Sequence, residues 1–149
     1  MAKRRPTTAK IQNRRARFDY QLGDSFSVGV VLNGRETKAL RTGRGQLRGA
    51  YVSLIGGELW LVGAQISGTS AGPIAESEQT RNRKLLAKRR EIEAMTAFKQ
   101  QGLSLVPLEF LTGGRFIKLK LAVGRGRKRY DKRQAIRRRE AERTVRRAF

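Results

Sequence analysis

The fold class is decided by the stretch AYVSLIGGELWLV, residues 50–62. Two short runs rich in β-branched and aromatic side chains flank the pair Gly56-Gly57. A Gly-Gly pair between two such runs favours a two-residue turn joining antiparallel strands. The sequence therefore predicts a β-hairpin at this point.

Further strands are predicted on both sides of this hairpin. Residues 26–32 carry apolar side chains with a period of two and end at the turn pair Asn33-Gly34. Residues 103–111 favour a strand, in which Pro107 predicts an edge position or a bulge because proline has no N–H to donate. Residues 115–123 alternate again and predict a final strand.

Helical patterns are fewer. The clearest helix is predicted from about Leu85 to the stop at Gly102, with its apolar residues close to one face. Residues 36–41 are ambiguous between strand and helix, and we favour helix. Residues 13–20 favour a helical turn, whereas residues 67–80 predict a loop of low hydrophobicity.

Five or six short strands with one main helix exclude a doubly wound parallel sheet, in which strands and helices alternate. We expect a mainly β fold with flanking helices, namely a small OB-like antiparallel barrel, because closure removes exposed strand edges. A two-layer α+β sandwich is the alternative. The expected divisions are a basic N-terminal arm over 1–17, the barrel with its helices over 18–129, and a basic C-terminal tail over 130–149, helical or disordered.

The charge of the chain indicates a polyanionic partner. The 34 Lys and Arg residues against 12 Asp and Glu give a formal net charge of +22. Residues 1–17 hold a net charge of +7 and residues 125–149 a net charge of +9, so the excess lies at the two ends. Such ends also keep a protein soluble, but segments this cationic bind nucleic acid.

The composition excludes most catalytic chemistry. The chain has no histidine and no cysteine, which rules out Ser-His and Cys-His nucleophile pairs, disulfides and structural zinc. Its carboxylates are scattered, and the motif Gly43-Arg44-Gly45 lacks the spacing of a phosphate-binding P-loop. We therefore expect no enzyme activity, no metal and no cofactor. No apolar run approaches the roughly 20 residues that cross a bilayer, so a cytosolic protein is expected.

Two segments carry the features of an RNA-binding surface. Lys118 and Lys120 alternate along the last strand, which places both ammonium groups on one sheet face. The exit segment 124–130 then combines glycines, arginines and Tyr130, which are suited to phosphate approach and base stacking. An ordinary solvated strand face is the competing interpretation. The basic run over 83–92 is less specific, because similar helices bind membranes, partner helices or RNA.

The tail over 130–149 has high helix propensity from Ala135 to Phe149 but no apolar stripe. Asp131 and Gln134 have the spacing of a capping box at a helix start. Ile136 and Val145 would point to opposite sides of such a helix, so it could not pack one face on a core. We expect the tail to be disordered or frayed when free and helical against RNA, with a permanently docked helix as the alternative.

Six ordered motifs resemble those of the SsrA-binding protein (SmpB) family, the bacterial partners of transfer-messenger RNA. They are Asn13–Tyr20, Gly34–Arg41, Glu58–Leu61, Arg83–Leu86, Leu105–Leu108 and Gly126–Arg133, within a resemblance that runs from about Asn13 to Arg143. The resemblance implies an OB-type barrel that binds the tRNA-like domain of transfer-messenger RNA and delivers it to ribosomes stalled on broken messages. The elongation factor that carries aminoacyl-tRNA, with GTP, would accompany delivery.

The resemblance also implies roles for individual residues. Those that would meet the RNA are Tyr20, Glu36, Lys38, Arg41, Arg83, Lys84, Leu86, Lys88, Lys118, Lys120, Gly126, Arg127 and Lys128. Those that would work in the decoding centre of the small ribosomal subunit are Tyr130, Asp131, Lys132 and Arg133, with the tail in the empty messenger channel. The protein would act as a monomer when bound, in the bacterial cytoplasm.

The sequence departs from the family pattern at several positions. Ser27 stands where family members commonly carry a glutamate, Ala87 replaces the third leucine after Arg-Lys-Leu-Leu, and Phe18 replaces a common histidine. The alternative function is a structural ribosomal protein that binds ribosomal RNA, since such proteins also join small barrels to basic extensions. A metal-dependent nuclease would need a carboxylate cluster that the sequence does not provide.

Overall fold

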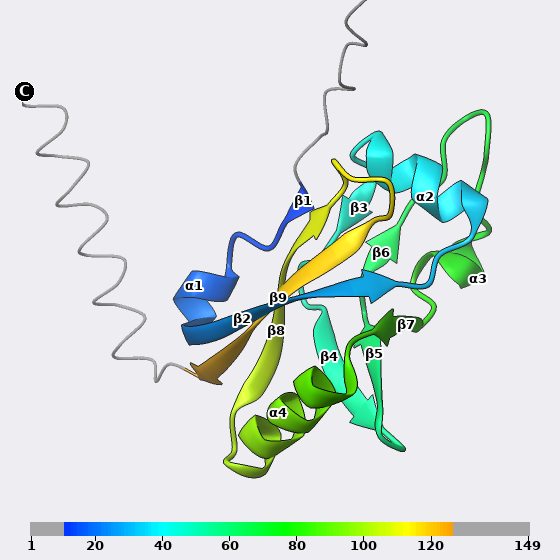
Figure 1. Cartoon of the computed structure of the whole chain (residues 1–149). Helices are drawn as coiled ribbons and strands as arrows, with labels where there is room; N and C mark the ends of the chain where they lie inside the picture. The colour runs from blue at the N-terminus through cyan, green and yellow to red at the C-terminus, as the bar shows by residue number, and fades with distance from the viewer. Residues whose placement is uncertain (1–10, 127–149) are drawn as a thin grey trace, which may run out of the picture.

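The computed structural model describes residues 11–126, which form a curved antiparallel sheet with helices at its ends (Figure 1). The strands are β1 (Ile11–Gln12), β2 (Tyr20–Val30), β3 (Gly45–Gln46), β4 (Tyr51–Ile55), β5 (Glu58–Val62), β6 (Gln65–Ile66), β7 (Arg83–Leu86), β8 (Ser104–Leu111) and β9 (Lys118–Gly126). The helices are α1 (Ala16–Asp19), α2 (Gly34–Arg41), α3 (Glu76–Gln79) and α4 (Arg89–Gln100).

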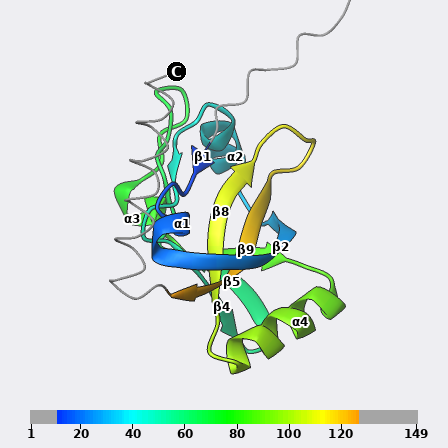
Figure 2. The ribbon, with the colours of Figure 1, turned by 90° about the vertical axis from the view of Figure 1, so that its left-hand side faces the viewer.

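Seven of the strands form one sheet in the order β1-β8-β9-β2-β7-β5-β4, and β3 pairs with β6 in a second, two-stranded sheet. The large sheet curls until β4, at one end of this order, contacts β8 near the other end. Within residues 11–126 no ladder of hydrogen bonds joins β4 to β8, so the OB-like barrel keeps a seam there. Helices α2 and α4 lie at opposite ends of the barrel (Figures 1 and 2). The predicted mainly β fold with flanking helices is confirmed.

The predicted hairpin forms as β4 and β5. The register runs from Tyr51 opposite Val62 to Ile55 opposite Glu58, which leaves Gly56-Gly57 as the two-residue turn. Both glycines have positive φ, 60° and 78°, a conformation that this turn requires and that other residues adopt at a cost.

The two strands predicted at the C-terminal side of the barrel are also confirmed. In β8 the register with β9 shifts between Pro107 and Glu109, so the proline marks the expected bulge. In β9 and the residue before it, alternate side chains enter the core, while Lys118 is exposed and Lys120 half-buried. The buried side chains of this alternating set are Ile117, Leu119, Leu121 and Val123, and Ala122 on the other side of the strand is buried as well.

The helix predicted from Leu85 begins later than expected. Residues 83–86 form β7, and α4 starts at Arg89. Leu85 pairs with Val30 of β2 on one side and with Leu59 of β5 on the other, so the segment occupies the middle of the sheet. Hydrogen-bond partners on both edges outweigh the local helical pattern. The loop predicted over 67–80 likewise contains the short helix α3.

The folded region also starts earlier than the boundary expected at residue 18. Ile11 is 4% exposed and pairs with β8, and Ala16 is 2% exposed in α1. Strand β2 begins at Tyr20 rather than at residue 26, and its register with β9 shifts between Leu22 and Ser25. The exposed run Gly23-Asp24-Ser25 at this shift breaks the alternation by which a strand is recognised in sequence.

The core fills the interior of the barrel and extends under the helices. Its buried side chains come from every strand except β3, with Leu40 from α2 and Met95 from α4. Both helices are amphipathic and close the barrel ends with their apolar faces. Since the helices cover the ends of the barrel, much of the outer surface of the strands faces solvent and can carry polar and charged side chains.

We predict that replacing Gly68 by alanine destabilises the fold. A Cβ atom there would lie 2.3 Å from the backbone nitrogen of Ile74 and 2.6 Å from the carbonyl oxygen of Gly72. Because both are backbone atoms, the loop would have to shift, and we expect a loss of about 2–3 kcal/mol in the free energy of unfolding.

Urea-induced unfolding measures this loss, and Gly34→Ala is the matched control. Position 34 is the first residue of α2 and has open space around it, so this alanine should leave stability unchanged or slightly raised. Equal stabilities of the two variants would contradict the close approach of the loop segments at Gly68.

Candidate nucleic-acid interface

The outer surfaces of β9, β2 and β7, which lie side by side in Figure 1, form one continuous face. Gly29 of β2 pairs with Lys118 of β9 on one side and with Leu86 of β7 on the other, while Ser27 pairs with Lys120. Paired residues of antiparallel strands point to the same side of the sheet. These five residues therefore share one side, which we call the lysine face.

The lysine face is cationic and has an apolar centre. Within residues 11–126 neither Lys118 nor Lys120 takes part in a salt bridge. Lys120 lies opposite Glu109 of β8 in register, whereas Lys118 lies between Leu111 and Gly29. Leu86, on strand β7 between β2 and β5, is 54% exposed and supplies the apolar part of this face. The predicted placement of both lysines on one face is confirmed.

The alternation of β7 divides the Arg83–Lys88 segment between the core and the surface. Arg83 and Leu85 point inward and are buried, whereas Lys84 and Leu86 point outward. The Nζ atom of Lys84 lies 3.2 Å from Oε1 of Glu58, in an exposed ion pair. Lys88 is exposed at the N-cap of α4, next to the lysine face.

Glu36 and Arg83 form a buried ion pair. Nε of Arg83 donates to Oε2 of Glu36 over 2.8 Å, and the side chains are 0% and 1% exposed, respectively. Arg81 also bonds to Glu36. A capping box holds the same carboxylate at the start of α2, because the N–H of Asn33 donates to Oε1 of Glu36 over 3.1 Å and the N–H of Glu36 donates back to Oδ1 of Asn33.

The remaining donors of Arg83 are satisfied by backbone carbonyls. They donate to Ala64 over 2.6 Å, to Gln79 over 2.9 Å and to Glu78 over 3.3 Å. Burial by itself raises the pKa of Glu36, but the bonds from Asn33, Arg81 and Arg83 outweigh it and hold that pKa below its ordinary value. Burial also lowers the pKa of Arg83, against the opposing effect of Glu36.

This network corrects the expectation that Glu36 and Arg83 contact RNA directly. Neither side chain reaches the surface, so any effect on RNA binding passes through the positions of α2 and β7. Arg41 also bonds within the protein: its guanidinium donates to the carbonyls of Thr112, Gly114 and Arg115. Lys38 is exposed on α2, as a direct contact would require.

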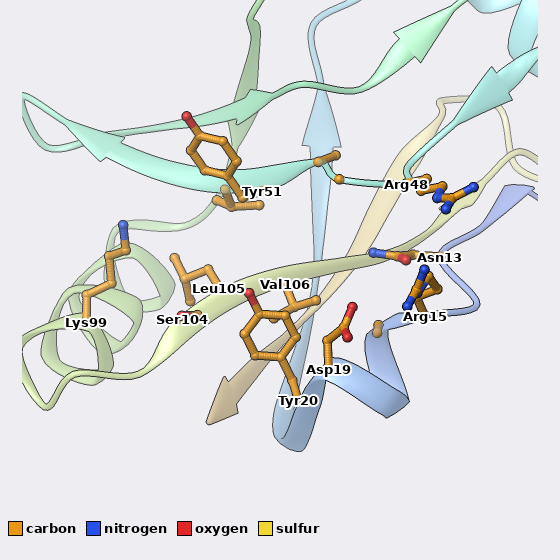
Figure 3. Close-up of a pocket in the computed structure, with 14 residues that line it drawn as sticks. Asn13, Arg15, Asp19, Tyr20, Arg48, Tyr51, Lys99, Ser104, Leu105 and Val106 are labelled. Carbon is orange, nitrogen blue, oxygen red and sulfur yellow. The ribbon is translucent and has the colours of Figure 1, made fainter. Parts of the chain in front are cut away.

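Tyr20 lies away from the lysine face, at the end of β2 that pairs with Gly126. It lines a cavity of about 520 Å³ at the seam between β4 and β8 (Figure 3). In this view Tyr20 and Tyr51 lie on either side of Ser104–Val106, with Lys99 at one end of the cavity. Arg15 and Arg48 lie at the other end.

Several predicted site residues lie outside the described part of the chain, namely Arg127, Lys128, Tyr130, Asp131, Lys132 and Arg133. Within residues 11–126 no group of three or more acidic side chains is placed to hold a metal ion. The same part of the chain has no helix long and apolar enough to span a membrane.

Two surface features were not predicted from the sequence. Phe116 is 72% exposed, and the guanidinium carbon of Arg115 lies 5.5 Å from the centre of its ring. Arg48 and Tyr51 join Tyr20 at the seam although about 30 residues separate them in sequence. An aromatic residue beside an arginine, just after Gly113-Gly114, is the signal that could have identified the first feature.

A curved antiparallel sheet with exposed lysines and an apolar centre on its outer face defines the class: a small OB-like barrel protein with a surface suited to nucleic acid. The chain belongs to the SmpB protein family, whose model matches residues 10–149.

Curated relatives are similar over nearly the whole chain. An SsrA-binding protein of Roseiflexus castenholzii is 44% identical over 139 residues, which cover 92% of this chain and 88% of the relative. An SsrA-binding protein of Gloeobacter violaceus is 40% identical over 140 residues, which cover 93% and 92%. A solved chain described as "tmRNA-SmpB: a journey to the center of the bacterial ribosome" matches with a TM-score of 0.68 and 34% identity, over 88% of this chain and 96% of that one.

We predict that Glu36→Gln lowers the free energy of unfolding by about 3 kcal/mol at neutral pH. The substitution leaves the buried Arg83 without its counter-charge, and breaking a buried pair in this way costs far more than breaking an exposed one. Glu58→Gln, which breaks the exposed pair with Lys84, is the matched control and should cost about 0.5 kcal/mol or less.

Urea unfolding at several pH values checks the same pair. Because the pKa of Glu36 is lowered in the folded state, its stabilising effect is complete above the ordinary value of 4.5 and is lost as the pH falls through the folded-state value. The stability gap between wild type and Glu36→Gln should therefore narrow below pH 4.5. A gap that stays constant into strong acid would contradict an ionised Glu36 in the core.

Proposed function

We propose that this protein binds the tRNA-like domain of transfer-messenger RNA and delivers it to stalled ribosomes for trans-translation. This proposal rests on one observation: the chain belongs to the SmpB family over residues 10–149. In addition, its barrel presents the lysine face, on which Lys118 and Lys120 form no salt bridge within residues 11–126. The relatives are named SsrA-binding proteins, and the similar solved chain is described with transfer-messenger RNA and the ribosome.

The lysine face is the proposed centre of RNA contact. Lys118, Lys120 and Lys88 supply charge for phosphates, and their ammonium groups release counterions from the RNA on binding. Leu86 offers an apolar surface on this face, and its side chain lies over Gly29 of β2, where a Cβ atom would come within 3.3 Å of it. This combination suits a folded RNA recognised by shape and backbone rather than by base sequence.

Further contacts are proposed around this centre. Lys38 on α2 and Lys84 on β7 are available from the surface, although Lys84 would have to leave Glu58. Tyr20 would meet RNA beside its ladder partner Gly126, and Arg127 and Lys128 are proposed as the next contacts along the sequence. Glu36 and Arg83 are assigned to holding α2 and β7 in place.

We propose that the C-terminal tail over 130–149 contacts the ribosome, a role separate from RNA binding by the barrel. Tyr130, Asp131, Lys132 and Arg133 would act in the decoding centre, with the rest of the tail in the empty messenger channel. Delivery would involve the elongation factor that carries aminoacyl-tRNA with GTP. The protein would act as a monomer in the bacterial cytoplasm, as an adaptor without catalysis of its own.

We predict that replacing both Lys118 and Lys120 by alanine weakens binding of the tRNA-like domain at least tenfold. The dependence of log affinity on log salt should become shallower by up to about one per lysine, because fewer counterions are released. Filter binding at several salt concentrations measures both quantities.

The matched control is Lys99→Ala, which removes an exposed cation of α4 outside the lysine face. This variant should keep wild-type affinity and salt slope. A double variant with an unchanged slope would remove the two lysines from the RNA contact.

A second prediction separates the tail from the barrel. Alanine at Lys132 and Arg133 should leave binding of free transfer-messenger RNA within about twofold of wild type, since the barrel carries the proposed contact. The same variant should lose most peptide tagging on stalled ribosomes in a reconstituted translation assay. Equal losses of RNA binding and tagging would contradict separate roles for the two parts.

A further inference from the structure

The turn between β8 and β9, residues 112–117, lacks hydrogen bonds of its own. It contains Gly113-Gly114, and no backbone–backbone hydrogen bond of the described chain outside its helices and ladders falls within it. A six-residue turn with two glycines and no internal bond is expected to sample many conformations unless other groups hold it.

Arg41 holds this turn. Its Nη1 donates to the carbonyl of Thr112 over 3.1 Å, and its Nη2 donates to the carbonyls of Gly114 over 3.2 Å and Arg115 over 2.9 Å. These bonds connect segments more than 70 residues apart in sequence, and Figure 1 shows the turn beside α2. Arg41 is the last residue of α2, whose other end is fixed by the buried pair of Glu36 and Arg83.

The turn presents an aromatic ring and a cation to solvent. Phe116 is the most exposed of the large apolar side chains in the described chain, and the Arg115 guanidinium lies 5.5 Å from the centre of its ring. Two residues later Lys118 begins the lysine face. An exposed ring between two cations is the arrangement on which an unpaired base stacks while its phosphates meet the charges.

We propose that Arg41 is a positioning residue, which fixes the 112–117 turn so that Phe116 stacks on an unpaired base of the bound RNA. This inference rests on the proposed function and assigns Arg41 an indirect role in place of a phosphate contact. The ligand of Phe116 is a base turned out of an RNA helix or loop, next to a phosphate held by Lys118.

Lysine at position 41 separates the two possible roles. It keeps the positive charge, so a simple phosphate contact would survive the substitution. It lacks the planar fork of donors that reaches three carbonyls together, so the hold on the turn would be lost. A positioning role therefore predicts that Arg41→Lys behaves like a loss of Phe116, and a phosphate contact predicts that it behaves like wild type.

The test is a double-mutant cycle on binding of the tRNA-like domain RNA, with Arg41→Lys, Phe116→Leu and the double variant. We expect each single variant to bind about tenfold more weakly and the double variant no more weakly than about tenfold, because both substitutions remove the same stacking. The salt slope of Arg41→Lys should equal that of wild type. Phe116→Trp, which keeps an aromatic face, should restore the affinity that Phe116→Leu loses.

NMR order parameters of backbone amides give a readout that needs no RNA. The order parameters of residues 113–116 should be lower in Arg41→Lys than in wild type, while those of the β4–β5 hairpin stay unchanged. Urea unfolding of each variant shows whether the substitution destabilises the whole fold. Because Phe116 lies on the surface, we expect Phe116→Leu to be as stable as wild type.

Several results would overturn the inference. Wild-type binding by Arg41→Lys would mean that the charge at position 41 is enough, as expected of a direct phosphate contact. Additive losses in the double variant would show that Arg41 and Phe116 act at separate places. Wild-type binding by Phe116→Leu, together with weak binding by the Lys118 and Lys120 double variant, would end this inference and leave the proposed function intact. Wild-type binding by all these variants would remove the proposed RNA face itself.

Discussion

The buried pair of Glu36 and Arg83 is the interaction on which the geometry of the surface depends. It joins the first turn of α2 to the start of β7, and the further donors of Arg83 reach the carbonyls of Ala64, Glu78 and Gln79. Charges this deeply buried are tolerated only when each is paired and hydrogen-bonded, and this network meets that condition. Because this network fixes the position of β7, Leu86 points outward. Because it fixes the position of α2, Arg41 reaches the β8–β9 turn.

The same network shows that net charge is a poor measure of the RNA-binding surface. Among the described residues, six arginines bond to or pair with oxygen atoms of the protein: Arg35, Arg41, Arg44, Arg81, Arg83 and Arg89. Lys88 and Lys118 are exposed, and neither takes part in a salt bridge within residues 11–126. The guanidinium fork suits several carbonyls at once, whereas the strongly hydrated ammonium group stays at the surface as a point charge. Arg41 and Arg83 thus hold parts of the scaffold together, whereas Lys118 supplies charge on the lysine face.

Those parts of the fold that depend on local pattern could be predicted from sequence. The Gly56-Gly57 hairpin, the bulge at Pro107 and the alternation through Lys118 and Lys120 all have their causes within a few residues. Strand β7 could not be predicted, because its state depends on ladders with β2 and β5 from distant parts of the chain. For the site, the family resemblance named candidate residues but could not show which of them are buried. The partner of Glu36 lies 47 residues away in sequence, and the carbonyls held by Arg41 lie more than 70 residues away.

The proposed function requires that the outer face of β9, β2 and β7 receives the tRNA-like domain of transfer-messenger RNA. Amide chemical-shift mapping of the full-length protein, titrated with that RNA domain, shows which face binds. We expect the largest changes at Gly29, Leu86, Phe116 and Lys118, with little change along the β4–β5 hairpin. Changes concentrated on that hairpin, with the β9–β2–β7 face unaffected, would contradict this requirement.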